Sequence, residues 1–195
     1  MYKNVFFKVI GNACISWWCF WSNIRFKKAI RKNIALLDED KQIKSIIDIT
    51  KIVDNVYKKF KWTSDGIDQL FDAITPPPQN YQHYVDGLLK DDCDGFHSSV
   101  YHILHNNNLL CCLLTTNAIN GGHCVLLFKF ENKWYINDYK RIYGGNIDIE
   151  KTIKDYNEIY QKLYKSKKVL YNGLVRYDYE KGKFYKETLK NLKTF

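Results

Sequence analysis

Proline is scarce in this sequence, and its three residues all lie in one run at positions 76–78. The ten glycines are not clustered and no internal repeat is visible, which excludes a collagen-like or low-complexity chain. Hydrophobic residues make up 46% of the sequence, so the chain has ample material for a core and is unlike a disordered chain. Its 195 residues favour one compact domain with an N-terminal extension.

The net charge of +9 is not accompanied by an uninterrupted block of basic residues, nor by a zinc-finger, helix-turn-helix or RNP-type signature. A charge of this size makes an anionic partner worth considering, whether nucleic acid, cell wall or membrane surface. Because no motif supports such a partner, we expect a generally solvated basic surface and no specific nucleic-acid partner.

The six cysteines lack the regular spacing of a small secreted disulfide framework. We therefore expect reduced thiols and a cytoplasmic location. Cys111, Cys112 and Cys124 lie in apolar runs, where cysteine usually acts as a small buried hydrophobe. Cys93 differs, because aspartates surround it on both sides.

The most apolar stretch, residues 5–21, falls short of the roughly 20 residues that a membrane-spanning helix needs. Its tryptophans suit a membrane interface better than a lipid interior, and a clear small-x-small cleavage site is missing. Burial against the protein's own core or a partner is the favoured interpretation. Contact of residues 5–21 with a membrane surface, and export, are the alternatives.

The spacing of apolar residues predicts helices over residues 24–37 and 43–60, with the acidic run 38–40 at the start of the second, and a short helix within residues 62–73. The prolines at 76–78 predict an extended break and then an irregular aromatic segment. A further helix opens at Cys93 and ends at the asparagines 106–108. Downstream we expect strands at 109–114, 124–130 and 134–139, a turn at 121–122, a helix over 149–163, and a hairpin of 169–179 with 183–186. This order is an α+β layout.

The chemistry points to Cys93. A thiol is mostly protonated at pH 7, so an enzyme lowers its pKa with a histidine and a helix N-terminus. Asp91 or Asp92 is a suitable N-cap, and the helix dipole favours a thiolate, but the flanking aspartates oppose it, so a nearby imidazolium is needed. His123 starts a strand after two glycines, and Asp138 ends an otherwise apolar strand that would not bury an unpaired carboxylate.

The chain resembles the transglutaminase-like superfamily of papain-fold enzymes in three motifs: Cys93-Asp94-Gly95-Phe96-His97, Gly122-His123-Cys124-Val125 and Trp134-Tyr135-Ile136-Asn137-Asp138. The resemblance covers roughly residues 62–143. Asp91 and His97 depart from it, since the family often has glycine and a small residue at these positions. These departures bear on substrate preference more than on fold.

The resemblance implies a papain-like, transglutaminase-core α+β fold, with N-terminal helices and a nucleophile helix packed on an antiparallel sheet. Residues 1–60 would form the apolar segment and packing helices, and residues 61–195 the catalytic core with its C-terminal helix and hairpin. In the implied triad, His123 takes the proton of Cys93 and Asp138 fixes the imidazole tautomer.

The oxyanion would be held by the backbone N–H of Cys93 and a second donor. Trp62 lies about where some family members place a tryptophan donor, although a core tryptophan is the favoured interpretation. Gln82, with Tyr81 and Tyr84, is a rival. The histidines of the nucleophile helix close no ligand set, so neither a metal nor another cofactor is predicted.

These features predict a cysteine hydrolase that acts on peptide or amide bonds of a protein or peptide substrate through a Cys93 thioester. Acyl transfer from glutamine to an amine uses the same triad and is one alternative. A catalytically silent binding or structural module is the other.

The triad depends on the register of one hairpin. Side chains alternate along a strand, so a two-residue loop at Glu131-Asn132 sets Val125 opposite Asp138 and leaves His123 one diagonal step away. An odd loop without a bulge would turn Asp138 to the other face.

Overall fold

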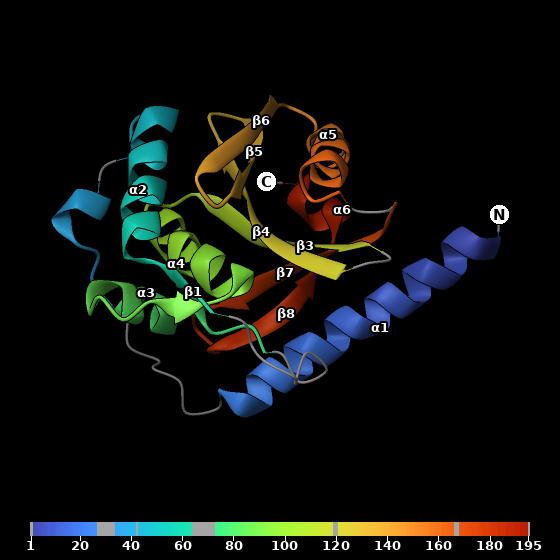
Figure 1. Cartoon of the computed structure of the whole chain (residues 1–195), viewed down its shortest axis with the longest axis horizontal. Coiled ribbons are helices and arrows are strands. Elements are labelled where there is room, and N and C mark those ends of the chain that lie inside the picture. Colours follow the sequence, from blue (N-terminus) through green and yellow to red (C-terminus); the bar gives the residue numbers. More distant parts are fainter. Residues whose placement is uncertain are drawn as a thin grey trace.

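The computed structural model describes residues 2–26, 34–41, 43–63, 73–118, 121–165 and 168–194. Its centre is a six-stranded antiparallel sheet in the order β6-β5-β4-β3-β7-β8. The strands are β3 (Leu110–Ala118), β4 (Gly121–Phe130), β5 (Lys133–Asp138), β6 (Arg141–Asn146), β7 (Val169–Asp178) and β8 (Lys183–Glu187). In the described part of the chain, six α-helices pack against it (Figure 1): α1 (Tyr2–Arg25), α2 (Ile46–Lys59), α3 (Pro77–Val85), α4 (Cys93–Asn106), α5 (Ile149–Leu163) and α6 (Leu189–Leu192). The predicted α+β layout is confirmed.

Helices cover both faces of the sheet. On one face α4 lies over β3 and β4, with α2 and α3 beside it, while α1 runs across β7 and β8 (Figure 1). The opposite face is covered by α5 and α6. Side chains alternate between the two cores, so Cys111 faces α4 and Cys112 faces α5, as predicted for this pair.

The predicted helix over residues 24–37 is wrong at residues 34–37. Helix α1 ends at Arg25, and residues 34–37 have no regular secondary structure, with Leu37 extended, while residues 27–33 lie outside the described residues. Backbone groups here bond to distant side chains instead of to a helical turn: the N–H of Leu37 donates to the Tyr81 hydroxyl at 2.8 Å, and the carbonyl of Ile34 lies 3.3 Å from His102 Nε2. Tertiary contacts thus replace the local helical pattern.

The start of the next helix also differs. The acidic run forms a separate 3-10 turn, η1 (Asp38–Asp40), and α2 begins at Ile46. Ser45 is its N-cap, with a side chain that accepts a hydrogen bond from the N–H of Asp48 at 3.3 Å. A hydroxyl cap sets this boundary more strongly than distant acidic charge does.

The proline run does not produce an extended break. Pro76 is the N-cap of α3, and Pro77 and Pro78 occupy its first turn, where a missing N–H costs little and the fixed φ suits a helix. Strand β1 (Lys61–Trp62) pairs in parallel with β2 (Lys90–Asp91). The short helix predicted within residues 62–73 falls largely on residues 64–72, which lie outside the described residues.

The C-terminal half follows the predicted strands, with two additions, β6 and α6. The sequence did not predict strand β6, because it contains Gly144 and Gly145 and glycine is uncommon in strands. Their φ angles are 110° and 90°. A Cβ at Gly144 would lie 2.6 Å from the Trp134 carbonyl oxygen, next to the register shift between β5 and β6. These glycines are therefore part of a bulged strand and not of a turn. The glycines predicted as a turn at 121–122 likewise open β4.

Candidate active site

Cys93 is the first residue of α4 and is partly exposed. Asp92 caps the helix, and its carboxylate accepts a hydrogen bond from the N–H of Asp94 at 3.0 Å. The prediction that Cys93 lies in the first turn is confirmed. A sulfur at this position is close to the positive end of the helix dipole, which favours the thiolate.

Gly95 allows the chain that enters α4 to pack closely against its first turn. A Cβ at Gly95 would lie 2.1 Å from Oδ2 and 2.2 Å from Cβ of Asp91. Real Cβ atoms do not approach other atoms so closely, so any side chain at this position would push Asp91 and strand β2 away. The glycine two residues after Cys93 therefore fixes the position of the helix N-terminus.

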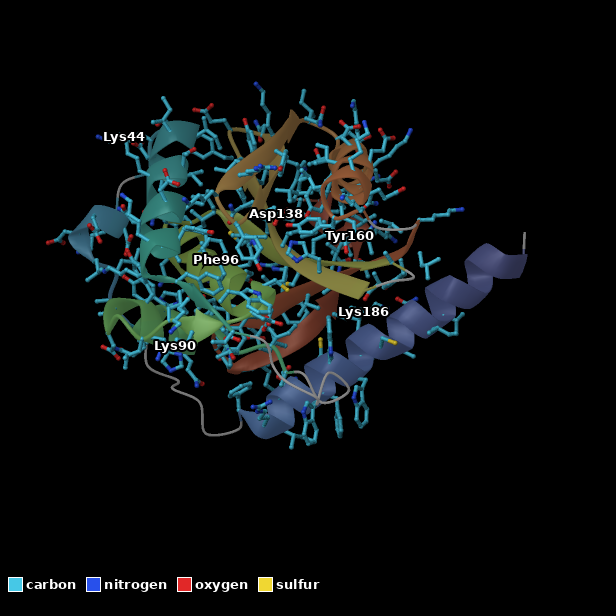
Figure 2. All side chains as sticks on the ribbon, viewed as in Figure 1. Lys44, Lys90, Phe96, Asp138, Tyr160 and Lys186 are labelled. Atoms are coloured by element: carbon cyan, nitrogen blue, oxygen red, sulfur yellow. The ribbon has the colours of Figure 1, made fainter. Side chains whose placement is uncertain are left out.

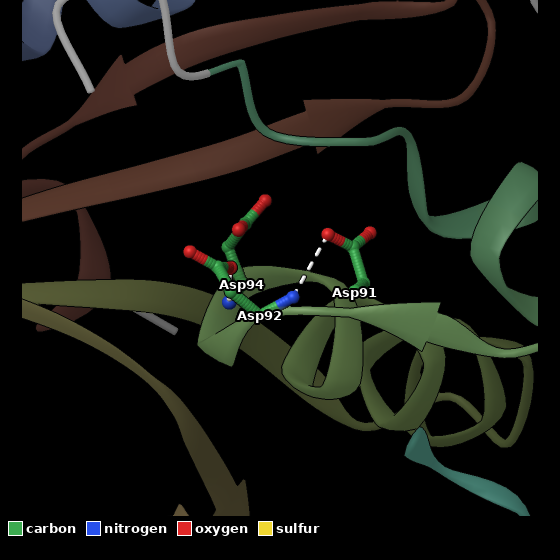
Figure 3. Close-up of side chains that lie close together, drawn as sticks. All are labelled: Asp91, Asp92 and Asp94. Atoms are coloured by element: carbon green, nitrogen blue, oxygen red, sulfur yellow. Dashed lines mark hydrogen bonds between the residues drawn. The ribbon is translucent and has the colours of Figure 1, made fainter. Parts of the chain in front are cut away.

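Three aspartates surround this N-terminus (Figure 3). One oxygen from each of Asp91, Asp92 and Asp94 lies within 4.8 Å of the others, and no comparable group of His, Cys, Asp and Glu occurs elsewhere in the described ranges. Carboxylate oxygens are ligands for hard divalent cations. Their present bonds are structural: Asp91 accepts from the N–H of Asp92 at 2.9 Å, and Asp94 from the N–H of Thr75 at 3.3 Å.

His123 and Asp138 meet across the β4–β5 hairpin. The loop has two residues, Glu131 and Asn132, with φ angles of 48° and 61°, values typical of a type I′ turn. Leu126 pairs with Asn137, which confirms the predicted register. Nε2 of His123 lies 2.9 Å from Oδ1 of Asp138.

Cys93 lies beside the same strand. The backbone N–H of Cys124, the residue after His123, donates a hydrogen bond to the Cys93 sulfur at 3.4 Å. The structure therefore brings the three predicted residues together at the start of α4, near the start of β4 and at the end of β5. A donor aimed at the sulfur also favours its charged form.

Asp138 is only 3% exposed, and two tyrosines from the region of α5 form hydrogen bonds with it. The sequence had marked Tyr156 only as an apolar position of a helix and had given Tyr164 no role. The hydroxyl of Tyr156 donates to Oδ2 at 3.0 Å, and that of Tyr164 lies 3.1 Å from both oxygens. Burial alone would raise the pKa of Asp138, but the hydrogen bond and charge of His123 and the Tyr156 hydroxyl together lower it below its ordinary value. Asp138 is therefore held in its charged form.

His97 connects the nucleophile helix to the end of β5. Its Nδ1 lies 2.5 Å from the Cys93 carbonyl oxygen, and its Nε2 accepts from the N–H of Tyr139 at 3.1 Å. Burial, followed by the nearby charge of His123, lowers the pKa of His97 to about 4, so the ring is neutral. One neutral tautomer satisfies both bonds, with Nδ1–H as donor and Nε2 as acceptor. The sequence had indicated His97 as a departure from the resemblance and as one of the helix histidines that close no ligand set, but not in this supporting role.

Because its buried histidines are neutral, we expect the protein to lose free energy of unfolding in mild acid. His97 titrates near 6.5 when unfolded and near 4 when folded, so between these values the unfolded state binds more protons. Its contribution to the unfolding free energy should fall by about 3 kcal/mol as the pH drops from 6.5 to 4 and level off below. Urea unfolding at several pH values measures this.

Other groups titrate in this range, so the comparison should be with His97→Gln. Burial lowers the pKa of His102 to about 4 as well, whereas it raises that of Asp40 to about 6, which acts in the opposite direction. The variant keeps both and should show a shallower pH dependence than the wild type. An unchanged slope would contradict the neutral, buried state of His97.

Two of the predicted oxyanion donors are engaged in other hydrogen bonds. Gln82 donates its amide to Asp86 on the same helix at 2.8 Å, and the hydroxyl of Tyr81 donates to Asp40 at 2.9 Å. Trp62 is 60% exposed, so the expectation of a core tryptophan is wrong, and it pairs with Asp91 on the strand that leads into α4. The Cys93 N–H, in the first turn, points out of the helix end.

A cleft of about 420 Å³ opens beside Asp138. Its lining combines aromatic and aliphatic side chains with two cations: Tyr57, Asp138, Tyr139, Lys140, Arg141, Leu163 and Tyr164. Cys93 is not among these residues. The cleft nevertheless adjoins the His123 ring, whose centroid lies 5.0 Å from that of Tyr164 and 5.8 Å from that of Tyr139.

No model of a known protein family matches this sequence, and no curated protein matches it significantly. The chemistry of the site is therefore inferred from its geometry and from the three sequence motifs.

Proposed function

We propose that this protein is a cysteine hydrolase of the transglutaminase-like kind, which cleaves peptide or amide bonds through a thioester on Cys93. The observation that carries the proposal is the hydrogen-bonded pair of His123 and Asp138 next to a cysteine at a helix N-terminus. Burying a carboxylate at the end of a sheet is costly unless it is fully hydrogen-bonded. Here a histidine supplies a hydrogen bond to the buried carboxylate and lies beside a thiol. This is the arrangement of an activated cysteine nucleophile.

In the proposed reaction, Nδ1 of His123 takes the proton of Cys93, while Nε2–H stays bonded to Asp138. The thiolate attacks the carbonyl carbon of the substrate, and the N–H of Cys93 stabilises the resulting oxyanion. His123 then protonates the leaving amine, and a thioester remains. Water, deprotonated by His123, attacks the thioester, releases the acid and restores the thiol.

The cleft beside Asp138 supports a protein or peptide substrate. Its tyrosine and leucine side chains offer flat apolar contact for an extended chain. Lys140 and Arg141 add positive charge at its edge, and Nζ of Lys140 lies 4.4 Å from the centre of the Tyr57 ring. The same cleft would serve transamidation, which an added primary amine reveals by diverting the acyl group from water.

Alkylation rates test the proposal directly. Iodoacetamide at pH 6 should label Cys93 at least about tenfold faster than Cys14, because a stabilised thiolate reacts where an ordinary thiol does not. Cys14 is the more exposed of the two, so accessibility alone predicts the opposite order. Burial raises the pKa of Cys19, Cys111 and Cys112, so these should stay unlabelled. Peptide mass spectrometry at timed intervals measures all rates together.

The matched variant for this experiment is His123→Ala. Without the imidazole, labelling of Cys93 should slow to the rate of Cys14 or below it. Equal rates for Cys93 in wild type and variant would show that His123 does not activate the thiol, and would favour a binding or structural module instead.

A further inference from the structure

Helix α1 is apolar on two opposite sides. Its inner side, with Ile15 and Cys19 buried, lies against β7 and β8. The contact is close at two glycines, because a Cβ at Gly11 would come within 2.3 Å of the Tyr171 ring and one at Gly173 within 2.4 Å of Ile15. The inner side of the helix therefore packs closely against the sheet.

The outer side exposes large hydrophobic residues. Exposed fractions are 62% for Val9, 44% for Ile10, 48% for Trp17, 55% for Phe20 and 39% for Ile24. Figure 2 shows side chains along α1 projecting away from the sheet. The Trp17 ring centre lies 5.9 Å from that of Phe20, so the rings form one continuous patch. A contiguous exposed patch of large apolar side chains normally marks an interaction surface.

The net positive charge of the chain is concentrated near its N-terminus, in α1 and the segment that follows it. Residues 1–37 contain seven Lys and Arg and no Asp or Glu, whereas the rest of the chain has 23 basic and 21 acidic residues. Most of the net charge of +9 therefore belongs to α1 and the segment that follows it. The basic residues are therefore unevenly distributed along the sequence, whereas the overall composition had suggested a generally basic surface.

We propose that α1 lies on the surface of an anionic lipid bilayer, with its outer side at the level of the lipid headgroups. Tryptophan and phenylalanine beside basic residues are typical of helices that lie in the membrane interface. In the described part of the chain, no helix is long and apolar enough to cross a membrane, which fits a helix on the surface. A second copy of the chain is a poorer occupant of this side, because two strongly basic segments repel each other.

Sedimentation with lipid vesicles tests the proposal. The full chain should bind vesicles that contain phosphatidylserine and not vesicles of phosphatidylcholine alone, and added salt should weaken the binding. Trp17→Ser with Phe20→Ser should reduce binding at least about tenfold, since Trp17 and Phe20 belong to the outer patch. The outer side does not pack on the sheet, so circular dichroism should show that the double variant folds.

The matched control is Trp62→Ser with Leu88→Ser, which removes a tryptophan and a leucine that are 60% and 61% exposed outside α1. Its binding should equal that of the wild type. The proposal is overturned if wild type ignores anionic vesicles or if the two double variants bind equally. It is also overturned if the Trp17/Phe20 variant instead dissociates a dimer or loses binding to an oligonucleotide.

Discussion

Replacing Cys93 by alanine should abolish turnover, with kcat/KM reduced at least about 10³-fold, because removal of a nucleophile leaves only binding and oxyanion stabilisation. Cys93 is partly exposed in the first turn of α4, so the variant should keep a melting temperature close to that of wild type. The release of p-nitrophenol from an activated ester measures the rate, and a rapid first turnover reports the thioester.

Cys14→Ala is the control for this experiment. Cys14 is exposed on α1, away from the site, so its loss should leave the rate unchanged. Wild-type turnover in Cys93→Ala would remove the basis of the proposed mechanism. Turnover lost equally in both variants would point to a general effect of thiol removal.

The sequence predicted the regions in which local pattern and tertiary packing agree. Helix α5 and the hairpin of β7 with β8 carry apolar residues at the spacing that their buried faces require. The meeting of His123 and Asp138 was predictable because a two-residue loop fixes which side chains share a face of a hairpin.

The prediction failed where distant contacts decide the local structure. The irregular residues 34–37 depend on bonds to Tyr81 and His102, which lie far along the chain. The proline run was predicted to break the chain because proline disrupts the interior of a helix. The first turn of a helix tolerates proline, and α3 begins there.

The support of the site was also missed. His97 bonds to Tyr139, 42 residues away, and Tyr164 bonds to Asp138, 26 residues away. Neither pair forms a local sequence pattern. One signal was present in Tyr156 and Tyr160 on the inner side of α5, because buried tyrosine hydroxyls need hydrogen-bond partners.

The second large effect is expected at Asp138. Asp138→Ala should reduce kcat/KM by about 10²- to 10⁴-fold, because the imidazole loses the acceptor that keeps its proton on Nε2. The hydroxyls of Tyr156 and Tyr164 lose their acceptor as well, so a lower stability is expected. Asp155→Ala, which removes a carboxylate from the exposed side of α5, is the control and should leave the rate unchanged.

The pH profile separates a role in orientation from a role in charge. The pKa of Asp138 lies below its ordinary value, so the carboxylate stays charged throughout the neutral range and its titration should not appear in the wild-type rate above about pH 4. Asp138→Asn keeps an acceptor oxygen for His123 but loses the charge. If the asparagine variant recovers most of the rate that alanine loses, orientation of the ring is the main contribution. If both variants fall equally, the charge that stabilises the His123 imidazolium is required. A wild-type rate in Asp138→Ala, with Cys93→Ala inactive, would show that the histidine acts without this carboxylate.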